Sequence, residues 1–283
     1  LCDRKITVMG KGSMLKRPIG MMISPLQNLG VEVESDGFLP ISVKGPVKGG
    51  ETEVDGYVSS QFITGLLTAL PLAEDDTTLH IKHPNSTPYL AMTVDVANKF
   101  GIRIEHNDFH DFFVPGGQNY NPGHHDIEGD WSSAAFMLVA GAVAGRVSVL
   151  NMNPVSLQAD VAIVDVLAHV GAKIITDGNE ITVERNELRA FDFDATHCPD
   201  LFPILAVLAA NCAGTSTVRG AERLIHKESN RASAIVSEFT KLGINVTIED
   251  DVMTVKGGTI KGGTMDSYND HRIAMAGAIA SLN

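Results

Sequence analysis

The segment from Lys227 to Arg231 places two cations and a carboxylate at the start of a helical pattern. Apolar residues recur after it at helical spacing, and Gly243 follows them as a typical helix-ending residue. Lys and Arg at this end of a helix oppose the helix dipole, which favours anions there. Two interpretations are open: a solvated cluster in which Glu228 pairs with Arg231, or a site that binds an anion.

Other cations stand at the expected starts of other helices. Arg17 precedes Pro18, which suits the first position of a helix, and Arg272 follows Asp270 at a further helix start. Free backbone N–H groups at a helix N-terminus bind phosphate or carboxylate together with guanidinium groups. Each cation alone is also explained as a surface side chain. Their recurrence favours binding of an anionic ligand.

Hydroxyl and carboxyl side chains occupy the same helix-start positions. The set consists of Ser59, Ser60, Ser132, Ser133, Asp130, Asp200 and Glu228. Each serine is also explained as a simple N-cap, and Asp200 as the N-cap of a helix that begins at Leu201. If the set instead lines an anion site, its carboxyl groups can move protons there.

A unit of about 70 residues recurs four times along the chain. Its marker is a helix end, a glycine and an alternating strand, with the glycines at positions 30, 101, 171 and 243. A turn and a second strand follow each marker, which predicts a hairpin. Further helices are predicted at 60–67, 133–140, 201–208 and 271–278. The period exceeds that of most solenoids, so we expect compact subdomains with their helices covered by sheet.

Composition indicates two domains. The chain has 283 residues, of which 44% are hydrophobic, and the loop 116–123 is its most linker-like stretch. We therefore expect domains over residues 1–126 and 127–283. The formal net charge of −12 argues against a nucleic-acid or anionic-membrane surface. No apolar run is long enough to span a membrane, so a cytoplasmic protein, expected to be a monomer, is predicted.

Cysteine and histidine positions predict neither disulfide nor metal. Cys2, Cys198 and Cys212 are scattered without a CxxC motif, which suits free thiols in a reducing compartment. The histidines from His80 to His125 never adopt a clean metal-ligand spacing. We predict no metal and no cofactor.

Several short motifs, in their order and spacing, resemble the EPSP synthase (3-phosphoshikimate 1-carboxyvinyltransferase) family of enolpyruvyl transferases. The resemblance extends over nearly the whole chain and is carried by Lys16-Arg17-Pro18-Ile19-Gly20, Asp55-Gly56-Tyr57-Val58-Ser59-Ser60-Gln61-Phe62, Ser86-Thr87-Pro88-Tyr89, Glu128-Gly129-Asp130-Trp131-Ser132-Ser133-Ala134, Pro199-Asp200, Lys227-Glu228-Ser229-Asn230-Arg231 and Tyr268-Asn269-Asp270-His271-Arg272.

The resemblance implies an α+β fold with α/β-type repeats: a two-domain inside-out α/β barrel of βαβαββ units, with helices inside and sheets outside. Each domain is expected to be partial here, the first, a substrate-binding domain, at its N-terminal side and the second at its C-terminal side. The implied reaction transfers the enolpyruvyl group of phosphoenolpyruvate to the 5-hydroxyl of shikimate 3-phosphate through a tetrahedral intermediate. The products are 5-enolpyruvylshikimate 3-phosphate and phosphate, within aromatic amino-acid biosynthesis.

The resemblance also implies roles for individual residues. Shikimate 3-phosphate would be held by Ser59, Ser60, Ser86, Tyr89, Asp200 and Lys227, and phosphoenolpyruvate by Arg17, Gln61, Arg231 and Arg272. Asp200 would take the 5-hydroxyl proton, and Glu228 would transfer a proton at the enolpyruvyl carbon. Lys227 would lie between the two substrates, and His271 near the transferred group.

The chain departs from the family pattern in several places. Asn230 stands where the family usually has Asp, and Ile225 where Arg is common. The family's N-terminal substrate-binding segment and a C-terminal lysine are not in the sequence, so we expect this chain alone to be inactive or nearly so. Two alternatives are kept: an enolpyruvyl transferase acting on UDP-N-acetylglucosamine, and a non-catalytic anion-binding module. The motifs at 86–89 and 268–272 favour the shikimate enzyme.

Overall fold

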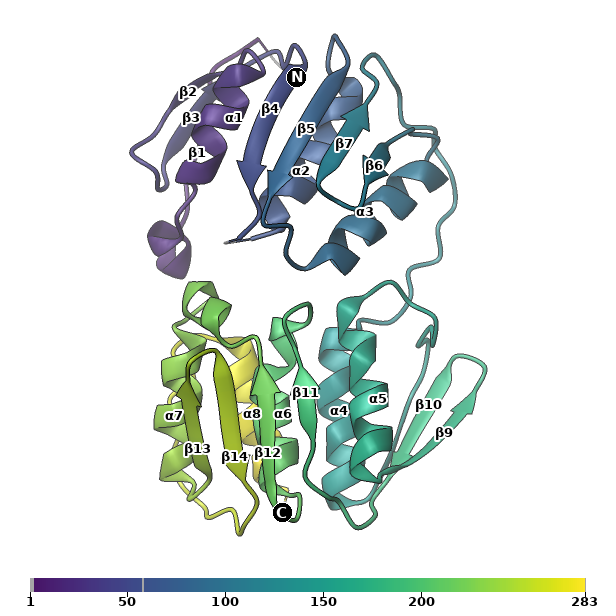
Figure 1. Ribbon diagram of the computed structural model, residues 1–283, viewed down its shortest axis with the longest axis vertical. Coiled ribbons are helices and arrows are strands. Elements are labelled where there is room, and N and C mark those ends of the chain that lie inside the picture. The colour runs from purple at the N-terminus through teal and green to yellow at the C-terminus, as the bar shows by residue number, and fades with distance from the viewer. Residues whose placement is uncertain (1–2, 58, 283) are drawn as a thin grey trace. The chain divides into compact units, whose positions relative to one another are not determined.

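The computed structural model describes residues 3–57 and 59–282 and divides the chain into two compact units, Leu1–His125 and Asp126–Asn283 (Figure 1). The boundary expected from the sequence lay one residue later, after residue 126. The side chain of His226 is not described, and Cys2, one of the three predicted free thiols, lies outside the described residues. The role and the completeness of each unit stay predictions.

The first unit contains two sheets. Its elements are β1 (Ile6–Val8), the 3-10 helices η1 (Gly12–Lys16) and η2 (Gly20–Met22), α1 (Ile23–Asn28), β2 (Glu32–Glu34), β3 (Ile41–Lys44), β4 (Gly50–Asp55), α2 (Gln61–Ala69), η3 (Leu70–Leu72), β5 (Thr77–Lys82), α3 (Thr87–Lys99), β6 (Glu105–Asn107) and β7 (Asp111–Val114). The strand orders are β1-β3-β2 and β4-β5-β7-β6. Only β4 and β5 pair in parallel among these described strands.

The second unit also contains two sheets. Its elements are α4 (Trp131–Ala144), β8 (Arg146–Val149), η4 (Ala159–Ala162), α5 (Ile163–Val170), β9 (Lys173–Asp177), β10 (Glu180–Glu184), β11 (Asp192–Asp194), η5 (Pro199–Leu201), α6 (Phe202–Ala210), β12 (Thr215–Arg219), η6 (Glu222–His226), α7 (Arg231–Lys241), β13 (Asn245–Glu249), β14 (Val252–Lys256) and α8 (His271–Ala280). The strand orders are β8-β10-β9 and β11-β12-β14-β13, with β11 and β12 parallel.

The repeat predicted from the sequence is confirmed. Segments 50–114 and 192–256 each run βαβαββ, and each forms a four-stranded sheet with the same strand order. The two three-stranded sheets, β1-β3-β2 and β8-β10-β9, have the same strand order as the last three strands of the βαβαββ unit in the four-stranded sheets. All four marker glycines adopt left-handed backbone, with φ of 86° at Gly30, 83° at Gly101, 98° at Gly171 and 78° at Gly243. The described strands form four separate sheets, so the mixed α/β fold is confirmed without a closed barrel.

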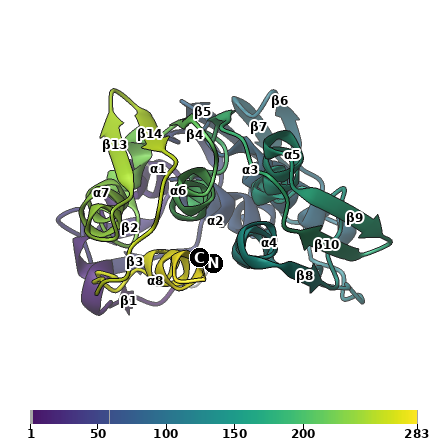
Figure 2. The same cartoon turned by 90° about the horizontal axis from the view of Figure 1, so that it is seen from below.

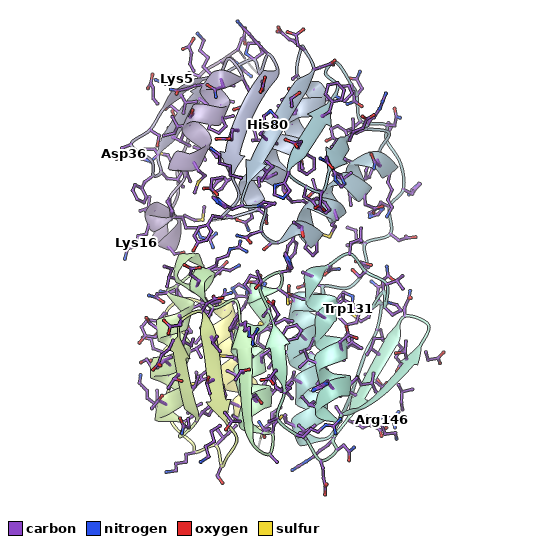
Figure 3. The ribbon with its side chains drawn as sticks, in the orientation of Figure 1. Lys5, Lys16, Asp36, His80, Trp131 and Arg146 are labelled. Carbon is purple, nitrogen blue, oxygen red and sulfur yellow. The ribbon has the colours of Figure 1, made fainter. Side chains whose placement is uncertain are left out.

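Three helices form the centre of the second unit. Figure 2 shows α4, α6 and α8 side by side, with the strands of the two sheets toward the outside. Every residue of α6 is buried, because its sequence is apolar all round. Trp131 opens α4, is fully buried and donates from Nε1 to the backbone oxygen of Asn153 at 3.0 Å (Figure 3). The second unit therefore has a core made of helices.

The outward face of the β4-β5-β7-β6 sheet carries paired charges. His80 on β5 lies between two carboxylates, with Nδ1 2.6 Å from Asp111 Oδ1 and Nε2 3.1 Å from Glu51 Oε1 (Figure 3). Hydrogen bonding to Asp111 raises the pKa of His80. Within the described residues, no group of His, Cys, Asp and Glu side chains could hold a metal ion.

One predicted helix start is wrong. Arg17 is not at the N-terminus of a long helix: it follows η1 with extended backbone (φ −77°, ψ 125°), and α1 begins only at Ile23. A residue before proline is pushed away from the helical region, so Pro18 here fixes an extended Arg17 instead of opening a helix.

Cys198 and Cys212 are buried free thiols, as predicted, and burial raises the pKa of Cys212 to about 12. None of the described helices is both long and apolar enough to cross a membrane.

Glycine at position 141 allows α4 to pack closely on its sheet, and we predict that Gly141→Ala destabilises the protein. A Cβ there would lie 2.6 Å from the backbone oxygen of Val183 on β10. Overpacking against backbone costs about 1–3 kcal/mol. Urea unfolding followed by fluorescence of Trp131, the single tryptophan, measures the change in the second unit.

Gly65→Ala is the matched control. Gly65 also lies within a helix, α2, but a Cβ there meets nothing within 4 Å. Replacing a helical glycine by alanine in open space stabilises by about 0.5–1 kcal/mol. Circular dichroism should therefore show the two substitutions acting in opposite directions; a stabilising Gly141→Ala contradicts the packing argument.

Candidate functional site

Arg231, the first residue of α7, is fully buried and contacts three carboxylates. Its Nε donates to Asp270 Oδ2 at 2.9 Å and its Nη1 to Asp200 Oδ1 at 2.8 Å, while Nη2 donates to Glu228 Oε2 at 2.6 Å. Burial of a charge is costly unless it is paired, and here burial is outweighed by these carboxylates, which raise the pKa of Arg231. Arg231 thereby ties together η5, the segment before α7, and the start of α8.

Asp200 contacts three cations. Besides Arg231, Lys227 Nζ lies 3.2 Å from its Oδ1 and Arg272 Nη2 lies 3.0 Å from its Oδ2. Burial favours the protonated form of this carboxyl, but the charges of Lys227, Arg272 and Arg231 outweigh burial and hold its pKa well below the usual range. The side chain of Asp200 is therefore an ionised group at the centre of a cationic triad.

The cations of this cluster differ in how far they are open to solvent. The side chain of Arg231 is 0% exposed, that of Arg272 14% and that of Lys227 21%. Burial lowers the pKa of Lys227, and Asp200 partly opposes this effect. An incoming anion can thus reach Lys227 and Arg272, whereas the donors of Arg231 are directed at carboxylates inside the protein.

Helix caps explain why cations are tolerated at these helix starts. Asp270 is the N-cap of α8 and accepts from the backbone N of Arg272 at 2.9 Å, while Asn230 caps α7 by accepting from Ser233 N at 3.1 Å. Capping satisfies free N–H groups, and the nearby carboxylates offset the positive charge. Asp200, by contrast, does not cap a helix: the N-cap of η5 is Cys198, so the simple capping interpretation of Asp200 is wrong.

Asn230 departs from the family pattern without removing the helix cap. Its side-chain oxygen provides the acceptor that a helix start needs, and it adds no further negative charge beside Glu228. The Glu228–Arg231 pair expected at this spacing is present. The segment from Lys227 to Arg231 therefore pairs partly with itself and partly with residues brought from other elements.

The serines of the second unit are not the N-caps that one of the two interpretations made them. Asp130, not a serine, is the N-cap of α4, and it accepts from the backbone N of Ser132 at 2.9 Å and of Ser133 at 3.3 Å. Ser133 Oγ also donates to Asp130. Ser132 Oγ instead donates to Asp160, a fully buried carboxyl of η4 that the sequence analysis missed.

The first unit gathers its predicted residues at the starts of two helices. Ser60 is the N-cap residue of α2 and Ser86 that of α3, yet neither side chain makes a capping hydrogen bond. Ser59 Oγ accepts from Gln61 N at 3.2 Å. Ser86 has left-handed backbone, with φ of 53°, and Tyr89 N donates to its carbonyl at 3.0 Å. The simple capping explanation given for Ser60 is thus wrong for its side chain.

Parallel strand pairs place these helix starts at equivalent sheet edges. In the first unit the Ser59–Gln61 segment follows β4, and Ser86 follows β5, which pairs with β4 in parallel. In the second unit Asp200 follows β11, and Lys227 follows β12, its parallel partner. The carboxyl ends of parallel strands are the usual location of ligand sites in α/β sheets. His271, the first residue of α8, is exposed.

Glu238 on α7 holds the loop that leads into α8. Its fully buried carboxylate accepts from Tyr268 Oη at 3.0 Å, from the backbone N of Asp266 at 2.9 Å and from Lys241 Nζ at 2.7 Å. Tyr268 and the next residue both have left-handed backbone immediately before Asp270. The sequence carried a signal for this role, since Glu238 is a charged residue among the buried apolar positions Ala234, Ile235 and Phe239 of α7.

Glu238→Gln should destabilise the second unit at neutral pH by about 1–3 kcal/mol, because a charged acceptor of several hydrogen bonds is lost. Hydrogen bonding to Lys241 lowers the pKa of Glu238 to about 2 from its ordinary value of 4.5. A lowered pKa stabilises the fold above the ordinary value, and this contribution is lost as pH falls toward the folded value. The wild-type advantage should therefore shrink between about pH 4.5 and about pH 2 in urea unfolding followed by Trp131 fluorescence.

Glu249→Gln, at the exposed end of β13, is the control for that measurement. It removes the same charge without the hydrogen-bonded loop, so it should change the free energy of unfolding by less than about 0.5 kcal/mol. Equal effects of the two substitutions would show that Glu238 does not hold the loop.

Known proteins share this sequence and fold. The sequence profile of the family described as EPSP synthase (3-phosphoshikimate 1-carboxyvinyltransferase) matches residues 1–283. Relatives named 3-phosphoshikimate 1-carboxyvinyltransferase are 38% identical over 283 residues in Clostridium novyi (strain NT), covering 99% of this chain and 65% of the relative, and 40% identical over 280 residues in Methanocella arvoryzae (strain DSM 22066 / NBRC 105507 / MRE50), covering 96% and 66%. The structure of EPSP synthase from Acinetobacter baumannii has the same fold, with a TM-score of 0.79 and 24% identity, covering 99% of this chain and 67% of that chain.

The alignment covers nearly all of this chain but only part of each relative. The chain spans 65% of the length of the Clostridium novyi protein. The family profile nevertheless covers the chain from its first to its last residue, and it includes the segments that form the Arg231 and Asp200 cluster. The chain belongs to the EPSP synthase family.

Proposed function

We propose that the protein transfers the enolpyruvyl group of phosphoenolpyruvate to the 5-hydroxyl of shikimate 3-phosphate. The observation that carries this proposal is the position of Asp200 between Lys227, Arg231 and Arg272 in a chain of this family. Glu228 is bound to Arg231. Two multiply charged anions need several cations, and addition to a hydroxyl needs groups that move protons. The cluster supplies both kinds of group.

Asp200 is the proposed acceptor of the hydroxyl proton. In the unliganded protein its low pKa makes it a weak base, because three cations stabilise the carboxylate. An anion bound beside Lys227 and Arg272 offsets those charges, so its arrival raises the basicity of Asp200. Proton removal is thereby coupled to the presence of a charged substrate.

Glu228 is the group proposed to serve in proton transfer at the enolpyruvyl carbon. Its side chain is 33% exposed, and Arg231 Nη2 binds Oε2 at 2.6 Å. A fixed guanidinium orients the carboxyl while leaving part of it accessible to a ligand. Different surroundings thus suit the two carboxyl groups to different proton transfers, with Asp200 surrounded by cations and Glu228 bound at one edge.

Arg231 is the group that positions both acids, and its direct contact with phosphoenolpyruvate requires exchange of one carboxylate for the ligand. Its guanidinium donates to Asp200, Glu228 and Asp270. Arg272, Arg17 and Gln61 are the other groups proposed to bind phosphoenolpyruvate. Arg272 fits this role because it is partly exposed and bound at one nitrogen to Asp200.

Shikimate 3-phosphate is proposed to bind hydroxyl groups and Lys227. The hydroxyl set is Ser59, Ser60, Ser86 and Tyr89, and the side chains of Ser60 and Ser86 are not used as helix caps. Lys227 and Asp200 contact each other and are both partly exposed, which suits them to contact a substrate hydroxyl together. His271 is proposed to lie near the transferred group. A monomer in the cytoplasm is proposed for the protein as a whole.

Asp200→Asn and Glu228→Gln should each lower kcat by about 10²–10⁴-fold with much smaller changes in KM, because general acid–base groups contribute to that extent in the transition state. The measurement is phosphate release by the protein expressed from its complete reading frame. Asp250→Asn, in the exposed turn before β14, is the control and should leave kcat unchanged. Wild-type turnover in either catalytic variant contradicts the assigned role.

The acceptor is tested by titration calorimetry with shikimate 3-phosphate and with UDP-N-acetylglucosamine. Selective binding of shikimate 3-phosphate, followed by formation of its enolpyruvyl ether in the presence of phosphoenolpyruvate, is the expected result. Selective binding of the nucleotide sugar overturns the proposal. Binding of both anions by the complete protein without any turnover identifies a non-catalytic module instead.

A further inference from the structure

A fourth carboxyl group lies beside the three carboxylates of the cluster and is not used in the proposed reaction. Asp160, in η4, is fully buried, and its Oδ2 accepts a hydrogen bond from Ser132 Oγ. Its Oδ1 has no hydrogen-bond partner in the described part of the chain. A buried carboxylate with an unsatisfied oxygen is costly, whereas the neutral acid is far less so. The geometry of Asp160 therefore favours a bound proton.

The charged surroundings of Asp160 come from several elements. Asp200 on η5 repels its negative charge, while Arg272 on α8 and Lys227 before α7 attract it, and the thiol of Cys198 is also close enough to interact. The helix α4 contributes Ser132 but no charged side chain, and α5 carries Asp165 and His169, which are both exposed. Burial and then Asp200 raise the pKa of Asp160 to about 6, against the opposing effects of Ser132, Arg272 and Lys227.

The charge of Asp160 affects how strongly the cluster around Arg231 attracts an anion. The cluster around Arg231 consists of three cations and three carboxylates, namely Lys227, Arg231, Arg272, Asp200, Glu228 and Asp270, so these six charges cancel. Arg223 on η6 adds a further positive charge near Lys227. Protonation of Asp160 removes one negative charge close to Lys227 and Arg272, so a dianion is bound more favourably when Asp160 carries its proton.

We propose that Asp160 is a positioning residue that takes up a proton from solvent when an anion binds beside Lys227 and Arg272, and so adjusts the charge of the site to its ligand. This inference rests on the proposed function, because it assumes the same anion site. No bond is made or broken other than the O–H bond of Asp160. By linkage, the anion favours the protonated carboxyl by the same factor as the protonated carboxyl favours the anion.

Sulfate is the probe, because it keeps both charges between about pH 5 and pH 8, the range in which Asp160 should titrate. Calorimetry of this chain in two buffers of different ionisation enthalpy gives the number of protons taken up per sulfate bound. We expect about half a proton or more near pH 6.5 in the wild type, and sulfate affinity about tenfold lower at pH 8 than at pH 5.

Three variants separate Asp160 from other titrating groups. Asp160→Asn keeps the shape and is neutral throughout, so its sulfate affinity should lose most of the pH dependence and its proton uptake should fall toward zero. Ser132→Ala removes the bond that stabilises the ionised form, so proton uptake should shift to higher pH. Asp165→Asn, on the exposed surface of α5, should behave as the wild type.

A measurement on the wild type covers the case in which Asp160→Asn fails to fold. The ¹³C carboxyl resonance of Asp160 should titrate near pH 6 and move to higher pH when sulfate is added. Titration below about pH 4.5, unchanged titration with sulfate, or proton uptake equal in Asp160→Asn and wild type overturns the inference.

Failure of the inference and failure of the proposed function are distinguishable. Absence of sulfate binding to the wild-type chain overturns the inference itself. Sulfate binding with the expected proton uptake, but no enolpyruvyl transfer by the complete protein, supports the role of Asp160 and contradicts only the proposed function.

Discussion

Burial of the Arg231 guanidinium among three carboxylates is the interaction on which the candidate site depends. A fully buried arginine is retained only if its charge is matched, and its partners come from positions 200, 228 and 270 of the chain. These partners leave little freedom for η5, the segment before α7 and the start of α8 to move independently. Asp200 and Glu228, the acids proposed to act in catalysis, are therefore held by the same contacts that stabilise the second unit. Their charges are thus positioned before a substrate binds, which is electrostatic preorganisation.

The cluster is assembled so that opposite charges alternate in space. Asp200 lies between three cations, and Arg231 lies between three carboxylates, so neither can be removed without leaving buried charge behind. The helix dipoles at the starts of α7 and α8 disfavour these cations, and the caps at Asn230 and Asp270 compensate. Binding of an anion changes this balance at its exposed side, where Lys227 and Arg272 lie.

The sequence predicted what depends on near neighbours. The marker glycines, the hairpins and the helix that starts at Arg231 were all readable, because turn chemistry and helical spacing are properties of short segments. The charge cluster was predicted in outline from repeated cations, and the family resemblance, which is confirmed, supplied the roles that remain proposals. Asp160 and Glu238 were missed because their partners lie far along the chain: Ser132 is 28 residues from Asp160, and Tyr268 is 30 residues from Glu238. Arg17 was misplaced because proline is compatible both with opening a helix and with extending the residue before it.

The short parallel pairing of β11 with β12 sets the relative positions of Asp200 and Lys227. Asp194 pairs with Arg219 at the end of this ladder. Beyond these residues the chain leaves β11 toward Asp200 and leaves β12 toward Lys227. One residue of a strand advances the chain by about 3.3 Å, so a shift in register by a single residue would carry Asp200 out of contact with Lys227. An insertion within β11 should therefore disrupt the cluster, since the spacing of the charges is inherited from the hydrogen-bond ladder rather than set by the side chains themselves.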